Sequence, residues 1–201
     1  MKRLQKDKVV RAAGISLVAL LVLQACAAAV VGGTTAAVTA HDRRSAGAVL
    51  DDQTLEVQVR DQIYASPEIG EETHLKVEVY KRIALLMGET DTEEHRELAG
   101  RLAGEVKWVE RVVNELTVQP AVGAGGRFNN SWMTAKVDTA LLTNNPVPGF
   151  DATRIKVVSS DGTVYLMGVV SRKEGDAVAE VARNVSGVQR VVKVFSYSDW
   201  C

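Results

Sequence analysis

The most specific chemical signal in the sequence is a cysteine at the end of an apolar run. Residues 23–26 read Leu-Gln-Ala-Cys and follow the mostly apolar residues 12–22, with five basic residues before that run. A basic start, a short apolar stretch and a small residue before the cleavage point are the parts of an export signal. The pattern predicts a lipobox, with cleavage before Cys26 and acylation of its thiol. The alternatives are an ordinary secreted protein and a short uncleaved anchor.

Acylation of Cys26 would hold the mature protein at a membrane. Each buried CH₂ contributes about 0.8 kcal/mol, so two or three acyl chains form an effectively permanent anchor. Residues 1–25 are then a removed signal peptide, and Ala27 stands where an aspartate would retain a bacterial lipoprotein in the inner membrane. The expected location is the outer membrane, lipid-anchored and facing the periplasm. The second cysteine, Cys201, is then an unpaired thiol that is reactive or dimer-forming.

No other set of residues predicts catalysis or metal binding. His41, His74 and His95 have no partner at ligand spacing on a clear common face. The glycine-rich residues 123–126 do not follow a strand and are not followed by Lys-Ser or Lys-Thr, as a phosphate-binding loop would be. We therefore expect a protein that is not an enzyme, with no metal, no cofactor and no nucleic-acid partner.

The charges of the mature chain are divided unequally. Residues 26–125 hold 10 basic and 17 acidic side chains, whereas residues 126–201 hold 9 basic and 7 acidic ones. Net charges of −7 and +2 indicate different partners for the two halves. The acidic half is expected to be repelled by an anionic surface and to serve as a spacer or a protein-binding module.

The two halves repeat one another. Leu86-Met87-Gly88 recurs 80 residues later as Leu166-Met167-Gly168. The apolar residues of two helical stripes also correspond, and they are Leu55, Val59 and Ile63 in the first copy and Met133, Val137 and Leu141 in the second. A repeat of this length indicates a duplicated small domain.

Each copy predicts the order helix-strand-strand-helix-strand. The i, i+4, i+8 stripe is typical of an amphipathic helix. Residues 160–163, Ser-Asp-Gly-Thr, predict a hairpin turn, and Tyr80–Ile83 is a weaker turn signal at the equivalent place. Ser171 with Glu174, and Asp91 with Glu94, are expected to cap the second helices. The expected fold class is α+β, with two three-stranded mixed sheets, each covered by two helices.

These motifs, with the Val-x-x-Val-Val pattern of the last strands, resemble the BON domain, present twice. A lipobox followed by two such copies is similar to dual-BON outer-membrane lipoproteins of Gram-negative bacteria. The predicted organisation is a tether at 26–50, domains at 51–118 and 130–196, a linker at 119–129 and a tail at 197–201. The first copy departs from the second at its last connection, where Trp108 replaces Gly187; we expect that connection to pack differently.

One surface feature differs between the copies. Trp132 and Lys136 are spaced to share a helix face beside the core stripe, where the first copy has Thr54 and Gln58. A tryptophan beside a cation suits a membrane interface with anionic head groups. The residues expected to bind anionic phospholipid are Trp132, Met133, Lys136 and Leu142. The alternative is that Trp132 packs against the other domain or the linker.

The resemblance further implies a role in envelope integrity and a location at division sites. It also leaves a rival open, because the BON family includes periplasmic proteins thought to assist other envelope proteins. In that alternative the chain is a protein-interaction or chaperone-like module, and its partners are outer-membrane proteins or their assembly factors. Binding that tracks anionic lipid and weakens with salt would separate the first function from the second.

Overall fold

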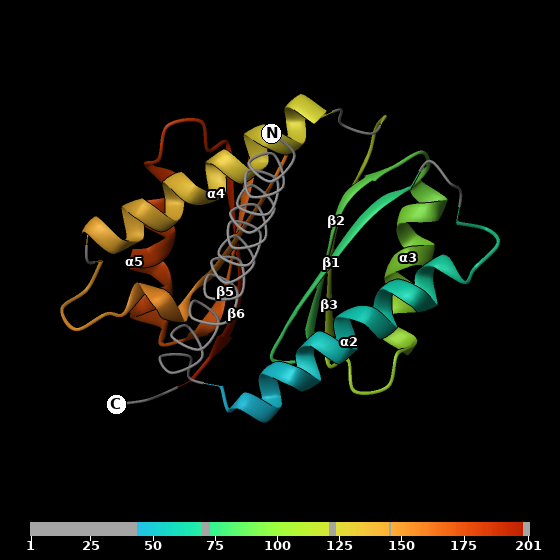
Figure 1. The fold of residues 1–201 in the computed structure, drawn as a ribbon, viewed down its shortest axis with the longest axis horizontal. Coiled ribbons are helices and arrows are strands. Elements are labelled where there is room, and N and C mark those ends of the chain that lie inside the picture. The colour runs from blue at the N-terminus through green and yellow to red at the C-terminus, as the bar shows by residue number, and fades with distance from the viewer. Residues whose placement is uncertain (1–43, 70–72, 121–123, 145, 199–201) are drawn as a thin grey trace, which may run out of the picture. The chain divides into compact units, whose positions relative to one another are not determined.

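The computed structural model describes residues 44–69, 73–120, 124–144 and 146–198, all within one compact unit, Asp42–Cys201 (Figure 1). The predicted signal peptide, the acylation site Cys26 and the thiol of Cys201 lie outside the described residues. Of the helices in the described ranges, none is both long enough and apolar enough to cross a membrane.

The first copy folds as predicted, in the order helix-strand-strand-helix-strand. Its elements are α2 (Ala46–Tyr64), β1 (His74–Tyr80), β2 (Ile83–Thr90), α3 (Glu93–Glu105) and β3 (Arg111–Val118). Strand β2 is central, antiparallel to β1 and parallel to β3. A parallel pair needs a crossover between its strands, and α3 provides it.

The second copy repeats this topology. Its elements are α4 (Ala124–Asn144), the 3₁₀ turn η1 (Ala152–Arg154), β4 (Lys156–Ser160), β5 (Thr163–Val170), α5 (Arg172–Arg183) and β6 (Arg190–Tyr197). Strand β5 is antiparallel to β4 and parallel to β6. The predicted α+β class, with two three-stranded mixed sheets each covered by two helices, is confirmed.

Each domain builds its own core from the predicted helix stripes. Leu55, Val59 and Ile63 of α2 pack with Ala99 and Ala103 of α3 and with one face of the first sheet. In the second domain, the stripe of α4 packs in the same way against α5 and the second sheet. The apolar spacing that identified the helices in the sequence is therefore also what attaches them to the sheets.

A third apolar cluster joins the other faces of the two sheets. It contains Tyr80, Ile83, Leu85, Met87, Val158, Tyr165, Met167, Val169 and Val194. Charged groups flank it: Arg190 pairs with Glu115 at 2.5 Å, and Lys156 pairs with Glu78. Burial alone would raise the pKa of Glu78, but the ammonium groups of Lys156 and Lys76 lower it. Because both faces of each sheet are covered, β2 and β5 are buried along nearly their whole length.

The two hairpin turns use the same device with different residues. Asp161 and Gly162 have φ values of 42° and 74°, and Lys81 and Arg82 adopt the same left-handed conformation with φ values of 52° and 60°. The carboxylate of Asp52, only 3% exposed, accepts hydrogen bonds from the backbone N–H groups of Lys81 at 2.7 Å and Arg82 at 2.9 Å. It therefore holds a turn that the sequence of the turn itself does not favour.

Two helices begin earlier than the domain boundaries drawn from the sequence. Helix α2 starts at Ala46, where the side chain of Ser45 accepts a hydrogen bond from the backbone N–H of Ala48 at 3.2 Å. Helix α4 starts at Ala124. Both helices thus extend a few residues before the predicted domain starts at 51 and 130, and the tether at 26–50 and the linker at 119–129 stay predictions. Small residues and glycines, which favour flexible chain in a composition argument, are here included in helices.

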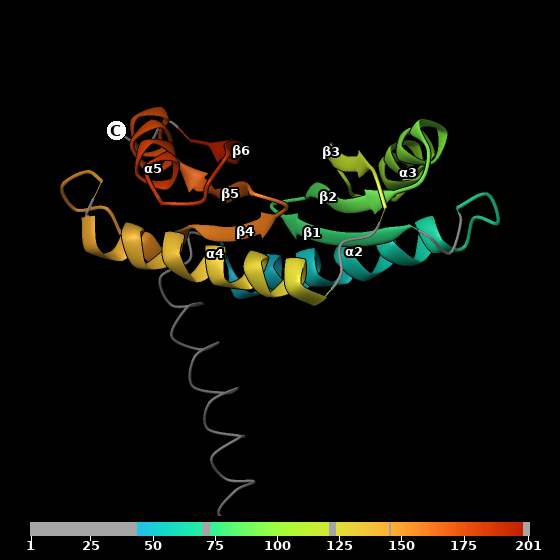
Figure 2. The same ribbon diagram turned by 90° about the horizontal axis from the view of Figure 1, so that it is seen from above.

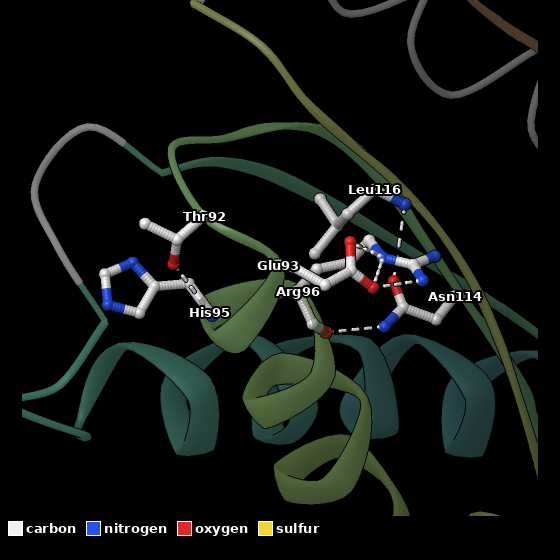
Figure 3. Close-up of polar contacts among 6 residues, drawn as sticks. All are labelled: Thr92, Glu93, His95, Arg96, Asn114 and Leu116. Atoms are coloured by element: carbon white, nitrogen blue, oxygen red, sulfur yellow. Dashed lines mark hydrogen bonds and ion pairs between the residues drawn. The ribbon is translucent and has the colours of Figure 1, made fainter.

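The cap of α3 differs from the prediction by one residue. Thr92, not Asp91, is the N-cap, and its side chain accepts a hydrogen bond from the backbone N–H of His95 (Figure 3). Ser171 and Glu174 form the predicted capping box of α5. Asp91 is thus an extra residue between β2 and α3, which explains why the repeat offset falls from 80 to 79 at this point.

The side chain of Asn114 links α3 to β3 through hydrogen bonds. Its side-chain N–H group donates to the carbonyl of Arg96 at 2.6 Å, and its side-chain oxygen accepts from the backbone N–H of Leu116 at 3.3 Å (Figure 3). A Cβ on Gly100 would lie 2.7 Å from the Asn114 amide nitrogen. The glycine therefore gives this amide access to the end of the first helical turn of α3.

Candidate functional site

Helix α4 has one buried and one exposed face. Met133, Val137 and Leu141 are in the core, and the opposite face carries Trp132, Ala135, Thr139 and Leu142, at i, i+3, i+7 and i+10. We call these four residues the α4 surface. It bears no charge, and its two large side chains, Trp132 and Leu142, are 58% and 64% exposed, the most of any apolar group among the described side chains of the helix.

The structure changes the predicted set of surface residues in one respect. Met133 is 2% exposed and belongs to the core, so its side chain has no access to a ligand outside the protein. It is one of the three stripe residues that attach α4 to the sheet. The error arose because Met133 adjoins Trp132 in the sequence, although neighbouring helical residues point about 100° apart.

Lys136 lies beside Trp132, but its ammonium group is already engaged. The group donates a hydrogen bond to the carbonyl of Ser186 at 2.5 Å, in the connection between α5 and β6. It also lies 3.4 Å from the position that a Cβ on Gly187 would occupy. Lys136 thus joins α4 to this connection, and its half-buried charge remains at the edge of the α4 surface.

A carboxylate lies at the opposite edge of the α4 surface. Asp138 is half-buried, and burial raises its pKa to about 6. Within the described residues, no ion pair to Asp138 is found. Sequence reasoning missed this group because its spacing resembles that of any solvated helix residue; only its burial distinguishes it.

The first domain places an exposed tryptophan at the equivalent location from a different element. Trp108, in the connection between α3 and β3, is 58% exposed. It lines a surface depression of about 400 Å³ together with Thr54, the counterpart of Trp132, and Gln58, the counterpart of Lys136. The guanidinium of Arg82 is 5.3 Å from its ring centroid and the ammonium of Lys107 is 4.7 Å away. We call Trp108, Arg82 and Lys107 the Trp108 site.

The backbone at Trp108 is strained for a residue with a side chain. Its φ is 79°, and the equivalent Gly187 has φ 96°. The two connections therefore share this backbone conformation, and they differ in packing because Trp108 lines a depression with Thr54 whereas Gly187 has no side chain. A bulky residue with positive φ is rare, because its Cβ crowds the following carbonyl oxygen.

Over the residues that the structure describes, no group of three His, Cys, Asp or Glu side chains could hold a metal ion. His95 pairs with Asp91, the distance between Nδ1 and Oδ1 being 2.6 Å. The α4 surface and the Trp108 site are built mainly from aromatic, apolar and cationic side chains, which are typical of contact surfaces.

The family comparison matches both copies. Residues 51–120 and 129–199 each correspond to the BON domain. An outer membrane lipoprotein, DolP, of Haemophilus influenzae is 37% identical over 186 residues, which cover 92% of this chain and 95% of that protein.

Two further relatives extend the comparison. A protein named 21 kDa hemolysin, from Actinobacillus pleuropneumoniae, is 37% identical over 78% of this chain and 79% of its own length. The osmotically inducible protein Y of Escherichia coli is 26% identical over 72% of each chain. Together with the duplicated fold, these likenesses show that the chain belongs to the BON-domain family, with two tandem domains in the arrangement of the DolP lipoproteins.

Proposed function

We propose that this protein is a lipid-anchored lipoprotein of the outer membrane whose second BON domain binds anionic phospholipid through the α4 surface. The likeness to DolP supports an outer-membrane lipoprotein of the envelope, and its relatives support a role that is not enzymatic. Acylation of Cys26 supplies the anchor, and the body faces the periplasm. Through the lipid contact the protein supports envelope integrity, with recruitment to division sites.

The observation that carries the proposal is the exposure of Trp132 and Leu142 on an uncharged helix face. The two side chains are ten residues apart, so they lie about 15 Å apart along the helix axis. An aromatic ring and an aliphatic group on one face suit the boundary between head groups and acyl chains. Lys136 and the net charge of +2 in residues 126–201 favour head groups that are anionic.

The expected affinity is low, and the anchor makes low affinity sufficient. A few cations at about 1 kcal/mol each, with one tryptophan, give dissociation constants of roughly millimolar to tens of micromolar. Tethering through Cys26 would raise the local concentration of lipid, so weak binding can still orient the domain on a surface.

Vesicle co-sedimentation of the mature chain with Cys26→Ser tests the proposal, because this form has no acyl anchor. Trp132→Ala and Leu142→Ala should each weaken binding to vesicles of phosphatidylethanolamine with phosphatidylglycerol, and together they should abolish it. Val118→Ala is the control, since Val118 is an exposed apolar residue of β3 that does not belong to the α4 surface. Phosphatidylcholine vesicles should bind little, and salt should weaken the anionic interaction.

Two results would overturn this assignment. Unchanged binding in the double variant would remove the α4 surface from the site. Binding that is equal on neutral and anionic vesicles would contradict the charge argument. Crosslinking of the wild-type chain to an outer-membrane assembly protein, lost on Trp132→Ala in the absence of lipid, would instead favour the protein-interaction function.

A further inference from the structure

The two domains present an exposed tryptophan at equivalent locations but take it from different elements. In the second domain Trp132 is on α4, and the connection after α5 has Gly187. In the first domain Thr54 is at the helix position, and the connection after α3 has Trp108. Because Thr54 and Trp108 line the same depression, the ring of Trp108 lies beside the place where a helix-borne tryptophan would be.

This exchange is not explained by packing. Trp108 remains 58% exposed, although its backbone has the positive φ that Gly187 adopts without a Cβ. A strained residue whose side chain is not buried gains little for the fold in return. Strained residues that persist in this way are concentrated at functional positions, so the outlier points to a contact outside the domain.

The groups around Trp108 indicate what that contact is. Arg82 and Lys107 approach its ring, which gives the site the combination of aromatic and cation that Trp132 and Lys136 give the second domain. Helix α2 adds Leu50, an exposed apolar side chain of its first turns. Figure 2 shows α2 and α4 along the same side of the two sheets, so a single flat surface could meet both.

We propose that the Trp108 site is a second contact with the anionic lipid surface, made by the first domain. The proposal rests on the proposed function of the α4 surface and extends it to a two-point attachment. The net charge of −7 in residues 26–125 predicts repulsion of this half, but its charges are unevenly distributed and two cations flank the ring. Glu110 pairs with Arg82 at 3.4 Å, and Asp51 lines the same depression. These two carboxylates partly offset the cations, so the first domain contributes the weaker contact.

The first test compares three variants of the mature chain with Cys26→Ser on phosphatidylethanolamine–phosphatidylglycerol vesicles. Trp108→Gly should weaken binding roughly fivefold, which is the effect of losing one contact worth about as much as one interfacial cation. Gly is chosen because the second domain already has it at this backbone position. Trp132→Ala should weaken binding more, and the double variant should lose it.

A transplant variant is the second test and guards against a general effect of truncation. Thr54→Trp combined with Trp108→Gly moves the aromatic from the connection to α2, as in the second domain, and should restore the binding that Trp108→Gly loses. The reciprocal pair Trp132→Thr with Gly187→Trp should retain binding. A Cβ on Gly187 would meet the ends of Lys136 and Met133 at 3.4 and 3.6 Å, and the φ of 96° there strains a side chain as the φ of 79° strains Trp108 in the first domain.

The outcomes separate this proposal from the one on which it rests. If Trp108→Gly binds vesicles as the wild type does while Trp132→Ala loses binding, the second contact is overturned and the proposed function stands. If both variants bind normally, both are overturned. If Trp108→Gly reduces binding equally on phosphatidylcholine vesicles, the contact does not select anionic lipid and the proposal fails. Thermal unfolding of each variant confirms that the domains remain folded.

Discussion

The first and second BON domains share their internal structure and differ at their surfaces. Both hold the hairpin turn with a side chain from the first turns of the first helix. This is the carboxylate of Asp52 in one domain and the amide of Asn130, which accepts from the backbone N–H of Asp161 at 3.0 Å, in the other. Both place the residue three positions before the last strand, Trp108 or Gly187, at positive φ. The duplication thus preserved positions that fix the backbone, while the exposed residues around them changed.

The comparison also shows that equivalent backbone positions are under unequal constraint. An Asp can hold a turn of two non-glycine residues, whereas Asn130 holds a turn that already contains Gly162. The more strained the backbone of a turn is, the more the stability of the domain depends on the side chain that holds the turn. Variants at matched positions should therefore have unequal effects, and the following four are ordered from the largest expected effect to the smallest.

Gly88 and Gly168 occupy matched positions in β2 and β5, and Gly88→Ala should be the more damaging. A Cβ on Gly88 would lie 1.9 Å from the carbonyl oxygen of His74, and its φ is 115°. On Gly168 the nearest backbone atom is the carbonyl oxygen of Arg154, at 2.9 Å, and no positive φ adds to the clash. We expect Gly88→Ala to lower the free energy of unfolding by about 4 kcal/mol, near the upper limit for point variants.

Urea titration of the two alanine variants measures this difference. Gly168→Ala is the matched control and should cost about 2 kcal/mol, because its clash needs a smaller backbone shift. Equal losses of unfolding free energy would show that alanine is no more strained at Gly88 than at Gly168, despite their different φ values.

Asp52→Ala should destabilise the first domain by about 3 kcal/mol. The substitution removes two hydrogen bonds to a strained turn and leaves the guanidinium of Arg44, now 2.6 Å from the carboxylate, without this partner. Losing one member of a buried ion pair typically costs 3–5 kcal/mol. The matched variant Asn130→Ala loses one neutral hydrogen bond and should cost about 1 kcal/mol. Similar values for both would contradict the idea that the non-glycine turn needs the stronger support.

The sequence predicted what depends on periodicity and repetition. Apolar spacing identified the helices and the stripes that form the cores, and the internal repeat identified two domains with one topology. The lipobox and the location that it implies depend on residues outside the described ranges, so they remain predictions.

The features that could not be predicted from the sequence depend on the tertiary environment of individual side chains. The role of Asp52 could not be read from its type, because an acidic residue near a helix start is usually solvated. Met133 was included in the lipid-binding set because it adjoins Trp132 in the sequence, although its own stripe places it in the core. Trp108 was recognised as a departure from Gly187, but its contact with Thr54 requires knowing which loop folds beside which helix. These are tertiary relations between distant segments, 29 residues apart for Asp52 and Lys81 and 54 for Thr54 and Trp108.

Asp138 should make the stability of the second domain depend on pH. Burial raises its pKa to about 6, so between pH 4 and 6 the folded state holds a proton that the unfolded chain releases. Stability from this group therefore falls as pH rises through that window and stays low above it. Asp138→Asn should raise the free energy of unfolding by about 1 kcal/mol at pH 7.5, a value reduced for partial exposure, and should have little effect at pH 4.

The counterpart of Asp138 in the first domain provides the control. Arg60 is at that position and is exposed. Arg60→Gln should shift stability by the same small amount at both pH values. A benefit of Asp138→Asn that is equal at pH 4 and 7.5 would show that the carboxylate is not the group that titrates.

Trp108→Gly should leave stability almost unchanged, and this is the smallest of the expected effects. Relieving a left-handed backbone at a bulky residue gains about 1–2 kcal/mol. Losing the contacts of Arg82 and Lys107 with the ring costs about 0.5–1 kcal/mol each at an exposed site. The two effects nearly cancel, so the urea midpoint should move little and the change in free energy should stay within about 1 kcal/mol.

Gly187→Ala is the opposite substitution in the second domain and should destabilise it by about 1 kcal/mol, since it introduces a side chain at φ 96° with no cation to contact it. A loss above about 2 kcal/mol for Trp108→Gly would mean that the first domain needs the aromatic in order to fold. The tryptophan would then be a structural compensation, and the two connections would no longer be equivalent backbones that carry different surface groups. A near-zero value leaves the exposed ring without a role in folding, which is the condition that a contact outside the domain requires.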